Sequence, residues 1–155
     1  MTPLPHRQCA AAVIQNAAGE VLLVQQNYGS HAWGAPGGVV ETGETPMEAA
    51  IRETQEELHV TPHAPRKLGE LRFSMSDCPH ILCHVYRSDN FSGTPTETDE
   101  AVPLWSALDA IPYHRMWEDD QHWLPLLLKE QSFLGRFVFE ADHLRWSEVT
   151  TDVVW

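Results

Sequence analysis

Short apolar runs recur along this chain of 155 residues, separated by clusters of Gly, Pro, Asn and charged residues. Runs of four to eight apolar or β-branched residues between such turn residues are typical of β-strands. The pattern predicts strands at Cys9–Gln15, Val21–Gln25, Leu68–Met75 and Ile81–Tyr86, and a closing hairpin made of Phe133–Glu140 and His143–Val149. Ala17–Glu20 predicts a hairpin turn between the first two strands.

Polar segments between these runs predict loops at Asn27–Pro36 and Asn90–Glu100, and Gly37–Glu41 predicts a short strand or turn. A helix is predicted from Thr45 to about Leu58, because Thr45–Glu48 has the pattern of a capping box with Pro at the first helical position. At about 100° per residue, one sector of this helix is expected to face the core and the opposite one to be acidic. The first sector holds Met47, Ile51, Thr54 and Leu58, and the second holds Glu53, Glu56 and Glu57.

A second helix is predicted within Asp119–Gln131. Pro125 is tolerated only in or near a first turn, so this helix is expected to start late. Strands that alternate with two helices predict an α/β (α+β) fold, an α/β/α sandwich on a mixed sheet. No linker interrupts the pattern, so residues 1–155 are expected to form a single domain.

The charge of the chain restricts its partners. Asp and Glu number 22 against 10 Lys and Arg, which gives a net charge of -12. Binding to duplex nucleic acid or to an anionic membrane needs the opposite balance, so we expect neither. A small anionic substrate remains compatible with this charge if a divalent cation bridges it to the protein.

Cysteine usage favours a reducing compartment. Cys9, Cys78 and Cys83 are odd in number and form no C-x-x-C pair, so no disulfide framework is expected. The first residues show no signal peptide and no apolar stretch reaches the ~20 residues of a membrane span, so a cytoplasmic protein is expected. Cys78, His80, Cys83 and His84 resemble zinc ligands, but residues 80 and 83 of one strand point to opposite faces, and a zinc site is not expected.

The acidic helix suggests metal chemistry. Clustered carboxylates on one helical face repel one another, and Arg52 is the only cation in this stretch. The simplest interpretation is a solvated acidic surface. However, Gly37 and Gly38 precede the helix, and Glu41 and Glu44 lie in the connecting loop. Clustered hard oxygens suit Mg²⁺ or Mn²⁺, and glycines allow the backbone to approach the same ions closely.

The same stretch resembles the Nudix box, G-x5-E-x7-R-E-U-x-E-E-x-G-U with U an apolar residue, of hydrolases that cleave nucleoside diphosphates linked to another group. The matching residues are Gly38, Glu44, Arg52, Glu53, Glu56, Glu57 and Val60. Two positions depart from the pattern. Thr54 replaces an apolar residue, and its methyl can still pack. His59 replaces the glycine that caps the helix in a left-handed conformation, so strain or rearrangement is expected there.

This resemblance implies a metal site and its supports. It implies that Glu53, Glu56 and Glu57 hold Mg²⁺, with Mn²⁺ as an alternative, assisted by the Gly37 carbonyl. The metal would neutralise phosphate charge and orient a water for in-line attack on phosphorus. Arg52 would orient a helix carboxylate and Glu44 would brace the loop. Glu100 is the candidate for a carboxylate from outside the helix, the alternative being a solvated loop acid.

Later segments resemble the mammalian-type MutT homologues, hydrolases of oxidised purine nucleoside triphosphates such as 8-oxo-dGTP. They include Gly93-Thr94-Pro95, Asp99-Glu100, Met116-Trp117-x-Asp119-Asp120 and Phe133-x-Gly135-x-Phe137, in this order. An indole such as Trp117 can stack on a purine, and Asp119 and Asp120 can read its edge if burial keeps one of them protonated. Alternatively, Trp117 is core and one aspartate only caps the helix.

Other positions follow from the resemblance alone. It implies that Phe73, Met75, Ile81 and Trp123 line the base pocket, with Gly37 and Gly38 beside the substrate. Two departures concern specificity: Gly34 stands where the family has an Asn that contacts the base, and Gln26 where it has a Lys near the phosphates. The base preference is therefore expected to be broader or shifted. Two alternatives remain for the function. The substrate could be another nucleoside diphosphate derivative (a dinucleoside polyphosphate, nucleotide sugar or capped RNA), or the protein could be a non-catalytic nucleotide sensor. A monomer is the expected oligomeric state, with a dimer as the alternative.

Overall fold

The computed structural model describes residues 6–26, 32–76 and 80–155. Its strands are β1 (His6–Ile14), β2 (Val21–Gln26), β3 (Trp33–Gly34), β4 (Gly37–Val39), β5 (Thr61–His63), β6 (Arg66–Met75), β7 (His80–Ser88), β8 (Asn90–Ser92), β9 (Ala101–Ser106), β10 (Phe133–Glu140) and β11 (His143–Thr151). Its α-helices are α1 (Pro46–Leu58) and α2 (Asp120–Leu128), and short 3-10 helices occupy Leu108–Ala110 and Tyr113–Arg115.

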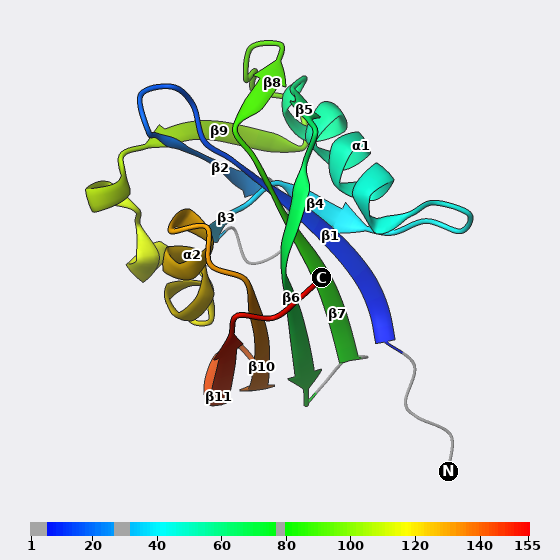
Figure 1. Cartoon of the computed structure of the whole chain (residues 1–155), viewed down its shortest axis with the longest axis vertical. Helices are drawn as coiled ribbons and strands as arrows, with labels where there is room; N and C mark the ends of the chain where they lie inside the picture. Colours follow the sequence, from blue (N-terminus) through cyan, green and yellow to red (C-terminus); the bar gives the residue numbers. More distant parts are fainter. Residues whose placement is uncertain (1–5, 27–31, 77–79) are drawn as a thin grey trace.

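In the described residues the largest sheet has the strand order β11-β10-β6-β7-β1-β4. It is mixed, because β1 pairs with β7 and β10 with β6 in parallel, whereas the other neighbours are antiparallel. A smaller sheet has the order β3-β2-β9, and β5 pairs with β8. Figure 1 shows α1 and α2 at opposite sides of these sheets.

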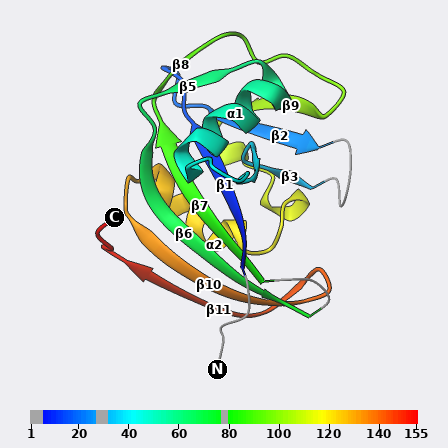
Figure 2. The ribbon, with the colours of Figure 1, turned by 90° about the vertical axis from the view of Figure 1, so that its right-hand side faces the viewer.

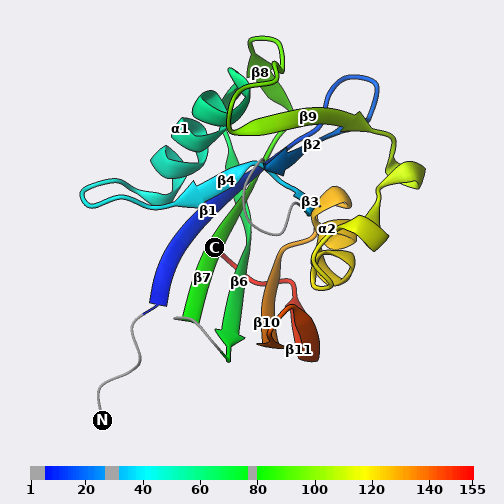
Figure 3. The ribbon, with the colours of Figure 1, turned by 180° about the vertical axis from the view of Figure 1, so that it is seen from behind.

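The two helices cover different faces. α1 packs against β1 and β4, and α2 packs against β10. Figure 2 shows α1 in front of the strongly curved large sheet with α2 behind it, and Figure 3 shows the reverse side, where α2 lies beside the short strand β3. The predicted mixed sheet between two helices is therefore confirmed. None of the described helices is long and apolar enough to cross a membrane.

The predicted strands are present, and the predicted hairpin turn between the first two of them is confirmed. Residues Asn16–Glu20 do turn the chain, with the Asn16 N–H donating to the Glu20 carbonyl at 3.0 Å. Only one bridge, Gln15 to Val21, then joins the two arms in the described part, because β1 continues into the large sheet and β2 into the small one. The closing hairpin β10–β11 is confirmed, with antiparallel pairing from Phe133 to Glu140.

The helix α1 begins where its sequence predicts. Thr45 accepts the Glu48 N–H at 3.2 Å, and Glu48 accepts the Thr45 N–H at 3.0 Å, which completes the capping box. The assignment of its faces was partly wrong. Met47 is exposed, whereas Glu57 is only 1% exposed and lies among the buried positions Ala49, Ala50, Thr54 and Leu58. The small alanines let α1 lie close to β1, and this proximity encloses the glutamate.

His59 ends α1 in the left-handed conformation, with φ of 59° and ψ of 33°, and its N–H donates to Gln55. A side chain in this conformation costs about 1–2 kcal/mol, whereas glycine adopts it readily and loses about 0.5–1 kcal/mol in chain entropy. We expect His59→Gly to raise the free energy of unfolding in urea by about 0.5–1 kcal/mol. His63→Gly in strand β5, where φ is not positive, should lower it. Equal losses from both substitutions would contradict this account.

The helix α2 differs from its prediction. It starts at Asp120 and ends at Leu128, with Pro125 inside it, so the expected late start is wrong. Proline at this position removes the N–H that would bond to Gln121. Gln121 is exposed, so water can replace that partner. The inner side holds Trp123, Leu124 and Leu127, which pack on the core that also contains Phe133 and Phe137.

Candidate active site

The acidic residues of α1 lie against the glycines of β4. Strand β4 pairs with β1 so that Gly37 is opposite Ala11 and Gly38 opposite Ala10. A Cβ at Gly37 would come within 2.4 Å of the Ala10 carbonyl oxygen, and one at Gly38 within 2.4 Å of the Glu53 carboxyl carbon. Glycine is therefore required at Gly37, where the obstacle is backbone, whereas a side chain at Gly38 would displace the Glu53 carboxylate. The close approach brings the helix carboxylates to the backbone of β4.

Glu57 is the most deeply buried of these acids. Its Oε1 accepts the Gly37 N–H at 3.3 Å, while its Oε2 is buried and has no hydrogen-bond partner in the described structure. Burial and the nearby Glu53 charge raise the pKa of Glu57 to about 8, against the smaller lowering effects of the Gly37 N–H and the Gln26 side chain. An unpaired buried oxygen and a raised pKa are both features that a positive charge beside Glu57 would relieve.

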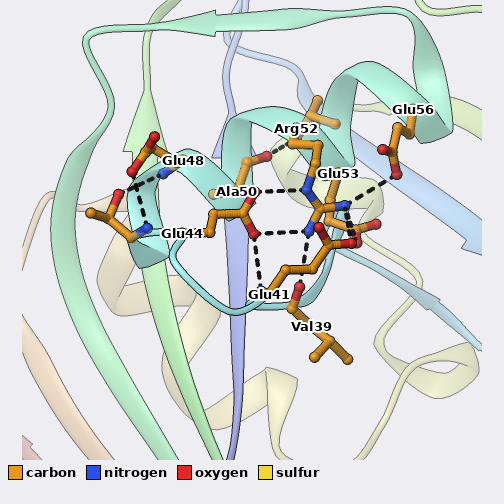
Figure 4. Close-up of polar contacts among 10 residues, drawn as sticks. Val39, Glu41, Glu44, Glu48, Ala50, Arg52, Glu53 and Glu56 are labelled. Carbon is orange, nitrogen blue, oxygen red and sulfur yellow. Dashed lines mark hydrogen bonds and ion pairs between the residues drawn. The ribbon is translucent and has the colours of Figure 1, made fainter.

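Arg52 organises the remaining acids (Figure 4). Its Nε and Nη2 bind both oxygens of Glu44 at 2.7 and 3.0 Å, and Nη2 also donates to the Val39 carbonyl at 3.0 Å. Its Nη1 donates to Glu53 at 2.9 Å and to Glu56 at 3.2 Å. Glu44 in turn accepts the Glu41 N–H at 3.1 Å, which ties the loop to the helix. The hydrogen bonds from Arg52, the largest effect, and from Glu41 lower the pKa of Glu44.

Arg52→Lys is expected to lower activity by about 10- to 100-fold, the usual effect of losing a group that orients metal ligands. A lysine ammonium cannot span the Glu44 carboxylate and the helix acids together, because its donors share one nitrogen. The Mg²⁺ concentration for half-maximal activity should rise in the same variant. Arg145→Lys, on the exposed β10–β11 hairpin, is the control and should leave both quantities unchanged. An unchanged Mg²⁺ requirement in Arg52→Lys would contradict the orienting role.

Glu100 lies near the helix carboxylates. Its side chain is exposed, yet its charge raises the pKa of both Glu53 and Glu57, after the larger effect of burial on each. The Thr98 hydroxyl donates to the Glu57 carbonyl at 2.7 Å and accepts the Glu100 N–H at 3.2 Å. This loop therefore holds the Glu100 backbone close to the end of α1 that carries Glu57.

These residues fit a divalent cation. The unpaired Glu57 oxygen and the mutual repulsion of Glu53, Glu57 and Glu100 are the features that a cation would relieve. Carboxylate oxygens are the preferred ligands of Mg²⁺ and Mn²⁺. Among the residues that the structure describes, no three His, Cys, Asp or Glu side chains already meet as a metal centre. Glu53 and Glu56 instead bind Arg52, which holds them beside Glu57.

A cavity of about 360 Å³ opens between the two sheets and α2. This volume is within the ~300–1,000 Å³ of small-molecule sites. The predicted pocket residues line it: Phe73, Met75, Ile81, Trp117, Asp119, Asp120 and Trp123, with Gly34 and Gln26. Trp117 makes a T-shaped contact with Phe139, with ring centroids 5.8 Å apart, and as a partly buried residue it also lines the cavity.

Asp119 and Asp120 are buried, at 4% and 8% exposure. Asp119 stands at the N-cap of α2, but its side chain makes no capping hydrogen bond and instead accepts the Trp123 Nε1–H at 2.9 Å. Burial raises the pKa of both carboxyls, and the Asp119 charge raises that of Asp120 further. The hydrogen bond between them lowers the pKa of Asp119 and raises that of Asp120. These directions favour the negative charge on Asp119, which accepts from Trp123 and from Asp120, and the proton on Asp120.

The buried acid pair should make stability depend on pH. The folded pKa of Asp120 is raised above the ~3.9 of an unfolded aspartate, so its stabilising effect is lost as pH rises from about 4 through the folded value. Asp120→Asn keeps a donor and cannot ionise. We expect it to gain stability relative to the unaltered chain by up to about 1.4 kcal/mol per pH unit in that window. Urea unfolding at pH 5, 6, 7 and 8 measures the difference, and a constant difference would contradict the prediction.

Other predicted site residues have different surroundings. Gly37 and Gly38 lie at the helix carboxylates and do not line the cavity. Gln26 lines the cavity and also lies at the helix carboxylates, because its side chain hydrogen-bonds Glu57. Of the cysteine–histidine group, Cys78 lies outside the described residues. Cys83 lines the cavity, whereas His84 contacts Gln8 and Lys67 elsewhere on the sheet.

Sequence reasoning missed part of the cavity wall. Ala11, Ala35 and Cys83 line it, but small apolar side chains carry no chemical signal in a sequence. The hydrogen bond between Asp119 and Trp123 was also missed. Its signal was available, since residues four apart lie on the same face of a helix.

Comparison with known proteins shows the family to which this chain belongs. Residues 5–127 match the family model of the NUDIX domain. An oxidized purine nucleoside triphosphate hydrolase of Danio rerio is 40% identical over 126 residues, covering 79% of this chain and 81% of that protein. The protein of the same name from Mus musculus is 37% identical over 119 residues, 76% of each. A MutT protein of Bacillus halodurans shares the fold, with a TM-score of 0.83 at 21% identity over 92% of this chain and 97% of that one. The chain belongs to the Nudix family, and the acidic helix, its glycine strand and Arg52 are the Nudix box of this member.

Proposed function

We propose that this protein is a metal-dependent pyrophosphohydrolase that cleaves oxidised purine nucleoside triphosphates to the monophosphate and pyrophosphate. It would thereby clear damaged nucleotides from the pool. One observation carries the proposal: Gln26 lines the cavity that holds the Asp119–Asp120 pair and also hydrogen-bonds Glu57 of the acidic helix. A nucleotide with its base at the aspartates therefore has its phosphates directed toward the carboxylates. The two relatives above carry the corresponding name.

The proposed cofactor is Mg²⁺, with Mn²⁺ as a substitute. Glu53, Glu56 and Glu57 would hold it, with the Gly37 carbonyl and Glu100 as further ligands. A cation bound there would supply neutralisation of the phosphate charge and would orient a water for in-line attack on phosphorus. The roles of Glu57 and Glu53 rest on their contacts with Gly37 and Gly38 of β4 and on the unpaired Glu57 oxygen. Glu56 is included because it shares Arg52 with Glu53, and Glu100 because its charge acts on Glu53 and Glu57.

The chain's own groups position the substrate. Arg52 and Glu44 fix the loop and turn the helix carboxylates toward one place. Trp117 offers a stacking surface, and the aspartates accept and donate one hydrogen bond each at the base edge. The buried walls around Phe73 and Trp123 exclude water from that edge, which strengthens these hydrogen bonds.

The test is pyrophosphate release with Mg²⁺ and a panel of nucleotides at matched concentration. The panel contains 8-oxo-dGTP, 2-hydroxy-dATP, dGTP and dCTP, with a dinucleoside polyphosphate, a nucleotide sugar and a capped RNA. We expect an oxidised purine triphosphate to have the highest kcat/KM, and phosphorus NMR to show pyrophosphate. If another nucleoside diphosphate derivative had the highest kcat/KM, the substrate would belong to that class instead. Release of orthophosphate from a triphosphate would contradict the cleavage position, and binding of nucleotides without any turnover would indicate a sensor.

The domain organisation, the oligomeric state and the location of the chain are also proposed. Residues 1–155 form a single domain, because β10 beyond the matched family region pairs with β6 and supplies Phe133 and Phe137 to the common core. We propose a monomer as the working unit, with size-exclusion chromatography as its test and a dimer as the alternative. A cytoplasmic location accords with a free nucleotide as substrate and with the cysteine usage of the chain.

A further inference from the structure

A buried arginine lies at the end of strand β7. Arg87 is only 7% exposed, although arginine is almost never buried without partners. Alternate residues of a strand share one face, so Arg87 is on the face of β7 that also carries Ile81, Cys83 and Val85. These three residues line the cavity, and Arg87 lies beyond them at the end of the strand.

All three nitrogens of the Arg87 guanidinium make polar contacts. Nη1 donates to the Leu127 and Leu128 carbonyls at 3.1 and 3.0 Å. Nη2 donates to the Gln15 Oε1 at 2.7 Å, and Nε donates to Asp89 at 3.1 Å. These contacts offset the cost of burying the charge. The side chain of Arg87 therefore joins strands β7 and β1 to helix α2 at one point.

The contacts with α2 fix the C-terminal end of the helix. The last carbonyls of an α-helix have no partner within the helix and carry partial negative charge, which a cation satisfies. Leu128 is the last residue of α2. Pro125 also removes one hydrogen bond from the interior of this helix, so α2 depends more on contacts from outside.

The other end of α2 carries the groups that read the base in the proposed function. Asp119 is the N-cap of the helix and Asp120 is its first residue, and both line the cavity. A helix of nine residues is about 13 Å long, and its hydrogen bonds make it move nearly as one body. A shift or tilt at the Arg87 end would therefore also move the two aspartates.

The contact with Gln15 connects Arg87 to the opposite wall of the cavity. Gln15 forms a bridge with Val21, the first residue of β2, and its Nε2 donates to the Gly19 carbonyl at 2.9 Å in the turn between β1 and β2. β2 then carries Val24 and Gln26 to the cavity. Arg87 thus holds α2 against the segment from which the β2 wall begins.

We propose that Arg87 is a positioning residue for the nucleotide, which sets the separation between the Asp119–Asp120 pair and the β2 wall of the cavity. It does so without touching the substrate, by holding the C-terminal end of α2 against Gln15. This inference rests on the proposed function, because it concerns how the base is held while the phosphates are cleaved.

The experiment measures the kinetics of Arg87→Lys and Arg87→Met with 8-oxo-dGTP and Mg²⁺. Lysine keeps the charge, but its donors share one nitrogen and cannot join α2, Gln15 and Asp89 together. Methionine removes both charge and donors. KM should rise by about tenfold in Arg87→Lys and by up to about 100-fold in Arg87→Met, the loss that a misplacement of ~1 Å can cause. Both kcat and the Mg²⁺ requirement should change less than about threefold, because Arg52 and β4 hold the carboxylates of α1.

The indole N–H resonance of Trp123 gives a second readout that needs no turnover. Trp123 Nε1–H donates to Asp119 at 2.9 Å, so its chemical shift in NMR spectra of isotope-labelled protein should change in both variants if α2 moves. Arg66→Lys is the matched control. Arg66 is opposite Arg87 in the β6–β7 ladder and binds Asp89 and Glu130, but its described contacts include no carbonyl of α2. It should leave KM and this resonance unchanged.

Thermal unfolding shows whether each variant is folded at the assay temperature, and Arg87→Lys alone carries the test if Arg87→Met is not. If the melting temperature of Arg87→Lys falls while its KM and the Trp123 resonance stay unchanged, Arg87 only stabilises the fold and the inference is overturned. Equal changes in KM, kcat and the Mg²⁺ requirement would overturn it as well. If the unaltered chain does not cleave 8-oxo-dGTP, the proposed function fails separately, and the Trp123 resonance still tests the link between Arg87 and the aspartates.

Discussion

Glu57→Gln is expected to lower kcat/KM by at least about 1,000-fold, equivalent to about 4 kcal/mol of transition-state stabilisation. Glu57 is the most deeply buried carboxylate of α1, and one of its oxygens has no partner in the described structure. Glutamine has the same size and can still accept the Gly37 N–H. The substitution therefore removes the negative charge that a divalent cation would meet, with little change in packing.

The same substitution should stabilise the metal-free protein. Burial and Glu53 raise the pKa of Glu57 to about 8, above the ~4.3 of an unfolded glutamate. Its contribution to stability is therefore present below about pH 4.3 and is lost as pH rises through about 8. Glutamine has no charge to bury. In metal-free buffer at pH 8 the melting temperature of Glu57→Gln should exceed that of the unaltered chain, and the difference should shrink toward pH 5.

Added Mg²⁺ separates this explanation from simple damage to the fold. A ligand that binds only the folded state raises the melting temperature, so Mg²⁺ should stabilise the unaltered chain more than Glu57→Gln. Glu148→Gln, on the exposed strand β11, is the matched control and should leave activity and Mg²⁺ stabilisation unchanged. Near-normal turnover of Glu57→Gln at saturating Mg²⁺ would overturn the metal assignment.

The local features of the fold could be predicted because their causes are local. The capping box of Thr45 and Glu48 and the left-handed residue at His59 mark both ends of α1 within the sequence itself. Sheet topology depends on distant partners. The sequence predicts the turn after β1, but it does not show that β1 pairs along its length with β7 and β4 rather than with β2. Such pairings depend on the packing of the whole core.

The chemistry of the candidate site could be predicted more fully than its burial. Spacing alone indicated that Arg52 and the acids of α1 act together, and Arg52 does bind Glu44, Glu53 and Glu56. Spacing could not show that Glu57 is enclosed, because the closeness of α1 to β1 depends on Ala49 and Ala50 and on the glycines of β4. The link between Gln26 and Glu57 also required the structure, since these residues belong to different elements.

Asp119→Asn is expected to weaken purine binding by about 10- to 150-fold, because hydrogen bonds to a charged group contribute about 1.5–3 kcal/mol. Asp119 accepts the Trp123 Nε1–H, and burial raises the pKa of Asp120 further than that of Asp119, so the negative charge of the pair favours Asp119. An amide at position 119 can keep the bond to Trp123 but loses the charged acceptor for the base. The KM for 8-oxo-dGTP should rise, while the Mg²⁺ requirement should stay within about twofold.

Asp120→Asn is the matched control, because an amide N–H₂ at this position imitates the protonated carboxyl. It should retain most of the affinity for 8-oxo-dGTP and lose the pH dependence that the acid pair confers. Trp117→Ala should weaken binding of all purines by about 1–3 kcal/mol per stacked base, without changing their order of preference. Equal kcat/KM for 8-oxo-dGTP, dGTP and dCTP, unchanged in Asp119→Asn and Trp117→Ala, would remove this cavity from base recognition. The acidic helix would then remain the site of cleavage, and the substrate would belong to another class of nucleoside diphosphate derivatives.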